Sequence, residues 1–242
     1  MKLKIENPAN FTKAIELISE LVLEVRIKIN EFGMSITAID PANVAMVNFR
    51  LPKSAFSEFE SGEEVLGVNL ENLKKILRRA GKTSALTLEK NENVLEIKIE
   101  DKIKRNFTLG LIEIEREDKE FPTQLEFSSK IEMNSIDLID SIEDCSIISD
   151  ACSFEVIQGN FIIESKELNS AKSEFSSDII NMEAEDCKSR YSLEYLQKFL
   201  KAGKFSEKTT LNFAQDHPLK VDFKLNEASL SFLLAPRMEI ED

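Results

Sequence analysis

The sequence predicts an α+β protein made of two topologically similar domains, each a mostly antiparallel sheet that carries two helices. An internal repeat is the first reason, because residues 70–81, LENLKKILRRAG, return 123 residues later as 193–203, LEYLQKFLKAG. Residues 4–6 return in the same way as 130–132, at an offset of 126. The second reason is patterning: both long copies space their apolar residues three or four apart, as amphipathic helices do, and the segments between them alternate as strands do.

The predicted elements follow in a similar order in each half. The first domain, 1–111, should contain helices at 7–22 and 70–81 and strands at 1–6, 23–29, 34–39, 44–51, 64–69, 85–89, 94–99 and 105–111. Residues 112–125 combine a run of charges with Phe121-Pro122, which is typical of an exposed connector. The second domain, 126–242, should contain helices at 135–148 and 193–203 and strands that include 172–177, 179–185 and 231–234. Gly81 and Gly203 are expected to end their helices in left-handed caps.

Basic residues concentrate on one predicted helix of an acidic protein. The chain has 44 acidic and 31 basic residues and a net charge of −13, which argues against a protein that coats nucleic acid with a uniformly basic surface. An anionic partner must therefore be met locally. The exposed face of the helix 70–81 offers such a surface, through Lys74, Lys75, Arg78, Arg79 and, just beyond the helix, Lys82.

Sequence motifs for catalysis, metals and cofactors are missing. Cys145, Cys152 and Cys187 form no CxxC pair, so neither a zinc site nor a disulfide framework is predicted, and a reducing compartment fits best. The single histidine, His217, has no recognisable nucleophile motif beside it, and the chain has no P-loop and no GxGxxG. We therefore predict a protein without enzymatic activity, cofactor or metal.

No targeting segment is evident in the sequence. The N-terminus alternates like a strand and lacks the apolar centre of a signal peptide. No apolar run approaches the ~18 residues that span a bilayer. We expect a soluble, cytoplasmic protein with no membrane partner.

Two predicted strands are candidate edges for assembly. An edge strand leaves backbone N–H and C=O groups unpaired, which invites pairing with another chain. The strands at 105–111 and 172–177 would provide a subunit interface through Arg105, Phe107, Leu109, Lys172, Glu174 and Phe175. Head-to-tail pairing of two different edges closes into a ring when the rotation between subunits allows it.

Several stretches, taken in order, resemble the sliding clamps of the proliferating cell nuclear antigen family, of the archaeal type. They are the connector ending in Phe121-Pro122 and the segments 33–47 GMSITAIDPANVAMV, 67–81 GVNLENLKKILRRAG, 191–203 YSLEYLQKFLKAG, 216–223 DHPLKVDF and 232–242 FLLAPRMEIED. No single stretch is decisive, but the resemblance covers essentially the whole chain. It implies trimers of two-domain subunits, with helices lining a central hole and sheets outside, which encircle duplex DNA and have no catalytic centre.

The resemblance also implies two sets of contact residues. By position, the residues facing DNA phosphates would be Lys13, Lys75, Arg78 and Lys201, with Lys74, Arg79, Lys82 and Lys198 beside them. A pocket under the connector would accept short peptide motifs through Ile39, Val44, Met46, Phe121, Pro218, Leu233 and Pro236. The implied partners are DNA polymerase, the clamp loader, flap endonuclease and DNA ligase, in the nucleoid of an archaeon or the nucleus of a eukaryote.

One helix departs from the family pattern. Residues 135–148 contain Asp137, Asp140, Glu143 and Asp144 and no Lys or Arg, where relatives usually carry arginines. Either the chain is one specialised subunit of a heterotrimer, or a homotrimer tolerates looser DNA contact on alternate domains. The alternatives to a self-assembling clamp are therefore a heterotrimeric or checkpoint-type clamp and an acidic scaffold that does not encircle DNA.

Overall fold

The computed structural model describes residues 1–81, 83–115 and 119–238, and the chain forms two compact units. Unit 1 contains Met1–Pro41, Val47–Phe121 and Leu225–Leu230, and unit 2 contains Ala42–Met46, Pro122–Lys224 and Ser231–Asp242. The division between Phe121 and Pro122 falls within the predicted connector 112–125. Ala42–Met46 belongs to unit 2, and Leu225–Leu230 belongs to unit 1. The strands β4 (Ala45–Pro52) and β18 (Ala228–Leu234) therefore each have residues in both units.

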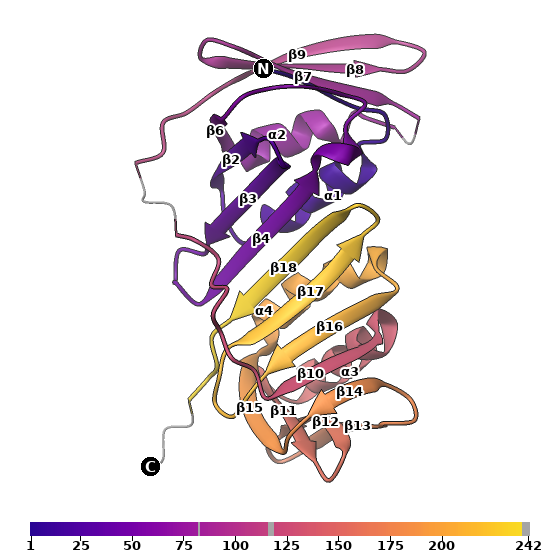
Figure 1. The fold of residues 1–242 in the computed structure, drawn as a ribbon. Helices are drawn as coiled ribbons and strands as arrows, with labels where there is room; N and C mark the ends of the chain where they lie inside the picture. The colour runs from indigo at the N-terminus through magenta and orange to yellow at the C-terminus, as the bar shows by residue number, and fades with distance from the viewer. Residues whose placement is uncertain (82, 116–118, 239–242) are drawn as a thin grey trace. The chain divides into compact units, whose positions relative to one another are not determined.

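Unit 1 combines two helices with two runs of antiparallel strands (Figure 1). Its other elements are β1 (Lys2–Ile5), α1 (Ala9–Ile18), β2 (Glu24–Asn30), β3 (Gly33–Ile39), the 3₁₀ turn η1 (Lys53–Ala55), β5 (Glu58–Glu60), β6 (Glu64–Asn69), α2 (Leu70–Leu77), β7 (Ala85–Asn91), β8 (Val94–Glu100) and β9 (Lys104–Gly110). The hydrogen-bonded neighbours run β5-β1-β7-β8-β9 and β6-β2-β3-β4.

Unit 2 repeats this plan. Its other elements are β10 (Ser129–Asn134), α3 (Ser135–Ile148), β11 (Ala151–Ile157), β12 (Asn160–Lys166), β13 (Ser170–Ser176), β14 (Asn181–Ala184), β15 (Cys187–Ser192), α4 (Leu193–Leu200), the 3₁₀ segment η2 (Lys201–Phe205), β16 (Lys208–Phe213) and β17 (Leu219–Leu225). The neighbours run β14-β10-β16-β17-β18 and β13-β12-β11-β15, the same pattern strand for strand. The predicted α+β class with two topologically similar domains is confirmed.

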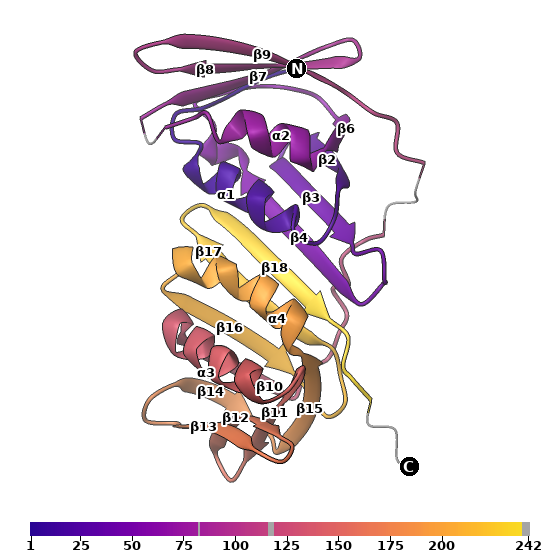
Figure 2. The same cartoon turned by 180° about the vertical axis from the view of Figure 1, so that it is seen from behind.

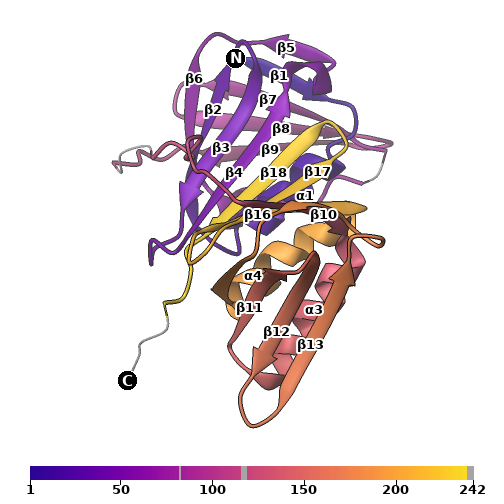
Figure 3. The ribbon, with the colours of Figure 1, turned by 60° about the horizontal axis from the view of Figure 1, so that its bottom comes forward.

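The helices of each unit pack side by side, α1 with α2 and α3 with α4 (Figure 2). Figure 3 shows α3 and α4 against one face of the strands β11, β12 and β13. Aromatic side chains fill the core of unit 2, where the fully buried Phe199 and Phe232 rings stack with their centroids 4.4 Å apart. Among the described residues, no helix combines the length and the apolarity needed to cross a membrane.

Some predicted boundaries were wrong. α1 and α2 end at Ile18 and Leu77, several residues before the predicted ends at 22 and 81, and the short strand β5 was missed. Neither Gly81 nor Gly203 has a left-handed φ. Space is tight at the glycine of the second copy, because a Cβ on Gly203 would lie 3.1 Å from Ile139 Cδ1 of α3.

Candidate nucleic-acid interface

The basic helix α2 is capped at its N-terminus and buries one apolar stripe. The Asn69 side chain accepts a hydrogen bond from the Asn72 backbone N–H at 3.1 Å, which caps the first turn. Leu70, Leu73 and Leu77 are buried, so the polar side of the helix faces outward. Among the predicted DNA contacts of this region, Lys75, Arg78 and Arg79 are exposed and Lys74 is half-buried, while Lys82 lies outside the described residues.

Most of the cationic side chains between α1 and α2 are paired with carboxylates. Glu16 of α1 accepts hydrogen bonds from Lys13 Nζ at 2.6 Å and from Arg78 Nε at 2.7 Å. Lys74 pairs with Glu71 and also donates to Ser19 Oγ at 3.2 Å. Partial burial pushes the pKa of Glu16 upward, but the hydrogen bonds from the two cations outweigh it and hold the pKa below the ordinary 4.5. Glu16 is therefore ionised at neutral pH and competes with phosphate for both cations.

Lys75 and Arg79 lie in a different position on α2. Lys74 and Arg78 point toward α1, whereas helical spacing turns Lys75 about 100° from Lys74 around α2, and Arg79 follows the end of the helix. Within the part of the chain that the structure describes, neither of these two side chains forms a hydrogen bond or close ion pair with a carboxylate, although the Lys75 charge helps to lower the pKa of Glu71. They are the more available positive charges of this helix.

The helices of unit 2 offer less positive charge. Lys198 of α4 pairs with Glu194 at 2.7 Å and lies 5.1 Å from the centre of the Tyr195 ring. Lys201, which follows α4, is exposed. On α3, three of the four carboxylates are exposed and the fourth is half-buried, and the helix contains no cation.

Both predicted edge strands are the last strand in a series of hydrogen-bonded strands. β9 pairs only with β8 and β13 only with β12 among the described strands. On β9, Leu109 is buried, Phe107 is half-buried, and Arg105 donates to the Arg79 carbonyl at 2.8 Å, which ties the edge to the end of α2.

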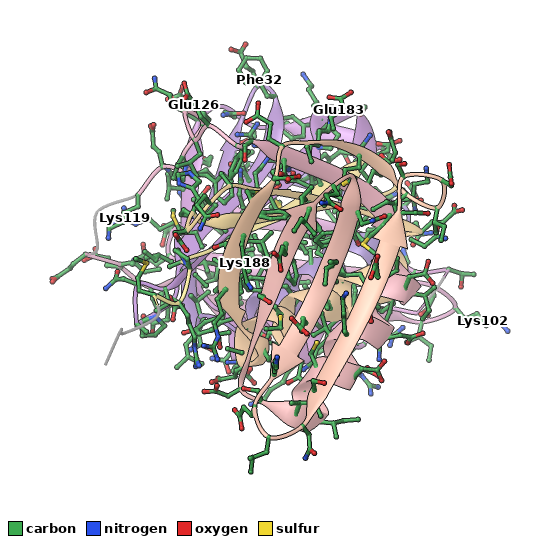
Figure 4. All side chains as sticks on the ribbon, turned by 90° about the horizontal axis from the view of Figure 1, so that it is seen from below. Phe32, Lys102, Lys119, Glu126, Glu183 and Lys188 are labelled. Atoms are coloured by element: carbon green, nitrogen blue, oxygen red, sulfur yellow. The ribbon has the colours of Figure 1, made fainter. Side chains whose placement is uncertain are left out.

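The second edge carries the other three predicted interface residues. On β13, Lys172 and Glu174 form an ion pair at 3.0 Å, and the Phe175 ring stacks on Phe161 with centroids 6.1 Å apart. Figure 4 views the β11–β13 strands from below, with their side chains.

The residues of the predicted peptide pocket divide between the two units. Ile39 and Phe121 belong to unit 1 and are half-buried. The other five residues belong to unit 2, where the Ala235 N–H donates to the Val44 carbonyl at 2.9 Å and so places the tail beside residues 42–46; these five are Val44, Met46, Pro218, Leu233 and Pro236. Leu233 is buried and the other four are half-buried.

Sequence reasoning missed Glu16, the residue that joins Lys13 to Arg78. The only signal was its position three residues after Lys13 on a predicted helix, a spacing that favours an ion pair. Its contact with Arg78 joins two helices and has no local signature. The described residues contain no group of three or more His, Cys, Asp or Glu side chains that could hold a metal ion.

Comparison with known proteins decides the family. Residues 1–121 match the model of the proliferating cell nuclear antigen N-terminal domain, and residues 122–238 match the model of its C-terminal domain. The chain belongs to the proliferating cell nuclear antigen family. Within this family it is 33% identical over 242 residues to the DNA polymerase sliding clamp of Pyrococcus horikoshii, covering 97% of each chain. It is 35% identical over 237 residues to that of Thermococcus gammatolerans, covering 95% of each.

Solved structures of the proliferating cell nuclear antigen family have the same fold. The crystal structure of the PCNA2-PCNA3 complex from Sulfolobus tokodaii superimposes with a TM-score of 0.89 and 26% identity, over 99% of this chain and 100% of that one. The proliferating cellular nuclear antigen of Entamoeba histolytica gives a TM-score of 0.90 at 22% identity, over 98% of each chain. Because the second identity is low, that likeness concerns the fold alone.

Proposed function

We propose that the chain is a DNA polymerase sliding clamp, a non-enzymatic processivity factor that encircles duplex DNA as a trimeric ring. The observation that carries the proposal is the match of both units, end to end, to the two domains of this family. The positive charge of α1 and α2 supports it, because their cations outnumber the carboxylates Glu16 and Glu71 of the same helices, and local positive charge on a chain of net charge −13 suits contact with phosphate. These cations are Lys13, Lys74, Lys75, Arg78 and Arg79.

The proposed contact is independent of DNA sequence. The eight residues of α2 span ~12 Å, or between three and four base pairs, so its cations meet phosphates in any register. Phosphate contacts carry no base information, which permits sliding. Acidic charge farther from DNA than a Debye length of ~8 Å is largely screened, so the net charge of the chain does not prevent binding.

We further propose that β9 of one subunit pairs with β13 of the next. α2 packs against β9 and α3 packs against β13, so this pairing brings the basic α2 beside the acidic α3 of the neighbour. Ile139 and Ser135 face η2, and helical spacing places Asp137 and Asp144 on the other side of α3, where they complement Lys75 and Arg79.

This arrangement accounts for the acidic helix. One chain carries both halves of the complementary pair, which favours a homotrimer. The Sulfolobus relative crystallised as a complex of two different chains, so assembly with paralogues is the rival. Exposed Ile147 and Leu168 near the β13 edge add apolar area to the proposed junction, since Ser149 donates to Glu167 at 2.8 Å and joins the end of α3 to the β12–β13 turn.

Light scattering tests the assembly. The wild-type chain should have about three times the 27.5 kDa of a single chain, and the double variant Lys75→Glu with Arg79→Glu should have the mass of one. Adding Asp137→Lys and Asp144→Lys to that variant exchanges the two signs and should restore the trimer. A wild-type mass of one chain would reject self-assembly and favour paralogues, and failure of the fourfold variant to reassemble would reject the proposed charge pairing.

Primer extension tests the clamp activity. With a DNA polymerase and its clamp loader, Lys13→Glu combined with Arg78→Glu should shorten the products, because two phosphate contacts become repulsive. Lys130→Glu combined with Lys224→Glu, an equal charge change on two exposed strand residues of unit 2, is the matched control. Product lengths unchanged in the double variant would favour the acidic scaffold that does not encircle DNA.

We also propose that polymerase, clamp loader, flap endonuclease and ligase dock through peptide motifs that contact Val44, Met46, Pro218, Leu233 and Pro236. The adjacency of the tail to residues 42–46 supports this assignment. Met and aliphatic side chains adapt to several partners. Val44→Asp should weaken binding of a polymerase-derived peptide without changing trimer mass, and unchanged peptide binding would contradict the assignment.

A further inference from the structure

A separate cavity of about 480 Å³ opens at the end of the β2–β3 hairpin in unit 1. Its volume is within the ~300–1,000 Å³ range of ligand-binding sites. Its lining comes from three segments, the hairpin, the end of β4 and the β17–β18 turn, and includes Phe32, Met34, Arg50, Leu51, Glu227 and Ser229. None of these residues belongs to the predicted peptide pocket, to the basic helix α2 or to the edge strands β9 and β13.

The conformation of the β2–β3 hairpin leaves the Phe32 side chain exposed. Gly33 has a φ of +134°, and a Cβ there would lie 2.3 Å from the Leu51 carbonyl oxygen, so only glycine allows this close approach. The Phe32 N–H donates to Asn30 Oδ1 at 3.0 Å, and the Phe32 carbonyl accepts from the Lys53 N–H at 2.9 Å. Phe32 remains 76% exposed, and Figure 4 shows its side chain projecting from the ribbon.

The cavity carries two charges of opposite sign that do not pair with each other. Arg50 is exposed, and its side chain has no ion pair or hydrogen bond among the described residues. Glu227 is exposed, and from the residues that the structure describes its side chain accepts a single long hydrogen bond, 3.4 Å, from Ser54 Oγ. The lining also includes the apolar side chains of Met34 and Leu51, which are buried.

We propose that this cavity binds a partner peptide in which an acidic and a basic residue flank a large apolar side chain. The apolar side chain fills the cavity against Met34 and Phe32, since exposed aromatic residues beside a pocket are typical anchors of protein recognition. The acidic residue pairs with Arg50 and the basic residue with Glu227. Two charges of opposite sign fix the direction of the peptide and reject peptides of a single sign.

Saturation-transfer NMR on the full chain tests the proposal with the peptide acetyl-Glu-Phe-Lys-amide. The peptide should bind, and acetyl-Gln-Phe-Gln-amide should bind about five-fold more weakly, because exposed ion pairs contribute up to about that factor. Arg50→Glu should weaken binding of the charged peptide by at least the same factor. Lys224→Glu is the matched control, because this exposed residue lines no part of the cavity, and it should leave binding unchanged.

A charge exchange separates specific binding from a general effect of charge. The variant Arg50→Glu with Glu227→Lys should recover binding of acetyl-Lys-Phe-Glu-amide to the wild-type level for the original peptide. Phe32→Ser should weaken both peptide–protein pairs. Equal binding of the charged and neutral peptides, an equal loss with Lys224→Glu, or tighter binding of free phenylalanine would overturn the proposal. The test needs no DNA, so its outcome is independent of the clamp activity.

Discussion

Neutralising Glu16 should strengthen DNA binding. Its carboxylate accepts hydrogen bonds from Lys13 at 2.6 Å and Arg78 at 2.7 Å, so phosphates must displace it to reach either cation. Glu16→Gln keeps the size and polarity of the side chain and removes the charge that competes with phosphate. Both cations then become available to DNA, which raises affinity and makes binding more dependent on salt.

The size of the effect follows from the two cations released. Each phosphate neutralised adds ~0.9 to the slope of log K against log salt, so two contacts add up to ~1.8. Over a four-fold change in salt, from about 50 to about 200 mM, that slope corresponds to a further affinity loss of up to ~12-fold. The variant should therefore gain most at low salt and converge on the wild type as salt rises.

Fluorescence anisotropy with a short duplex, measured across that salt range, gives both quantities. Glu63→Gln is the matched control, because it removes the same charge from an exposed residue of unit 1 that lies outside α1 and α2. The control should leave the slope unchanged. An unchanged slope with Glu16→Gln, or an equal gain with Glu63→Gln, would refute the view that Glu16 restrains these two cations.

Two further predictions concern stability. Gly67→Ala should lower the free energy of unfolding by about 1–3 kcal/mol and expose the connector to protease, because its Cβ would lie 2.0 Å from the Ile112 carbonyl oxygen. Gly62→Ala is the control, because a Cβ at Gly62 would have no atom within 4 Å. An equal loss of stability with Gly62→Ala would contradict the prediction. A hydrogen bond from the Ile103 N–H holds the pKa of Asp101 below 3.8, so its stabilisation is present above that pH and is lost as pH falls through the lowered pKa. With Asp101→Asn, the melting temperature should depend less on pH below about pH 4. The same pH dependence as in the wild type would contradict this prediction.

The sequence by itself determined the repeat and the character of each helix. Apolar spacing and the Asn69 cap are local properties, so residues 70–77 form an amphipathic helix in any context that buries the stripe. The strands were readable for the same reason, since alternation depends only on neighbouring residues. The order of elements in one half then predicted the other.

Only the tertiary structure decided which charges meet. Glu16 and Arg78 are 62 residues apart, and packing of α1 on α2 brings them to 2.7 Å, which no local pattern encodes. The tight space around Gly203 is likewise a tertiary feature, because it comes from Ile139 of another helix. Contacts between distant segments depend on how side chains fill shared space, and that information is distributed over the whole chain.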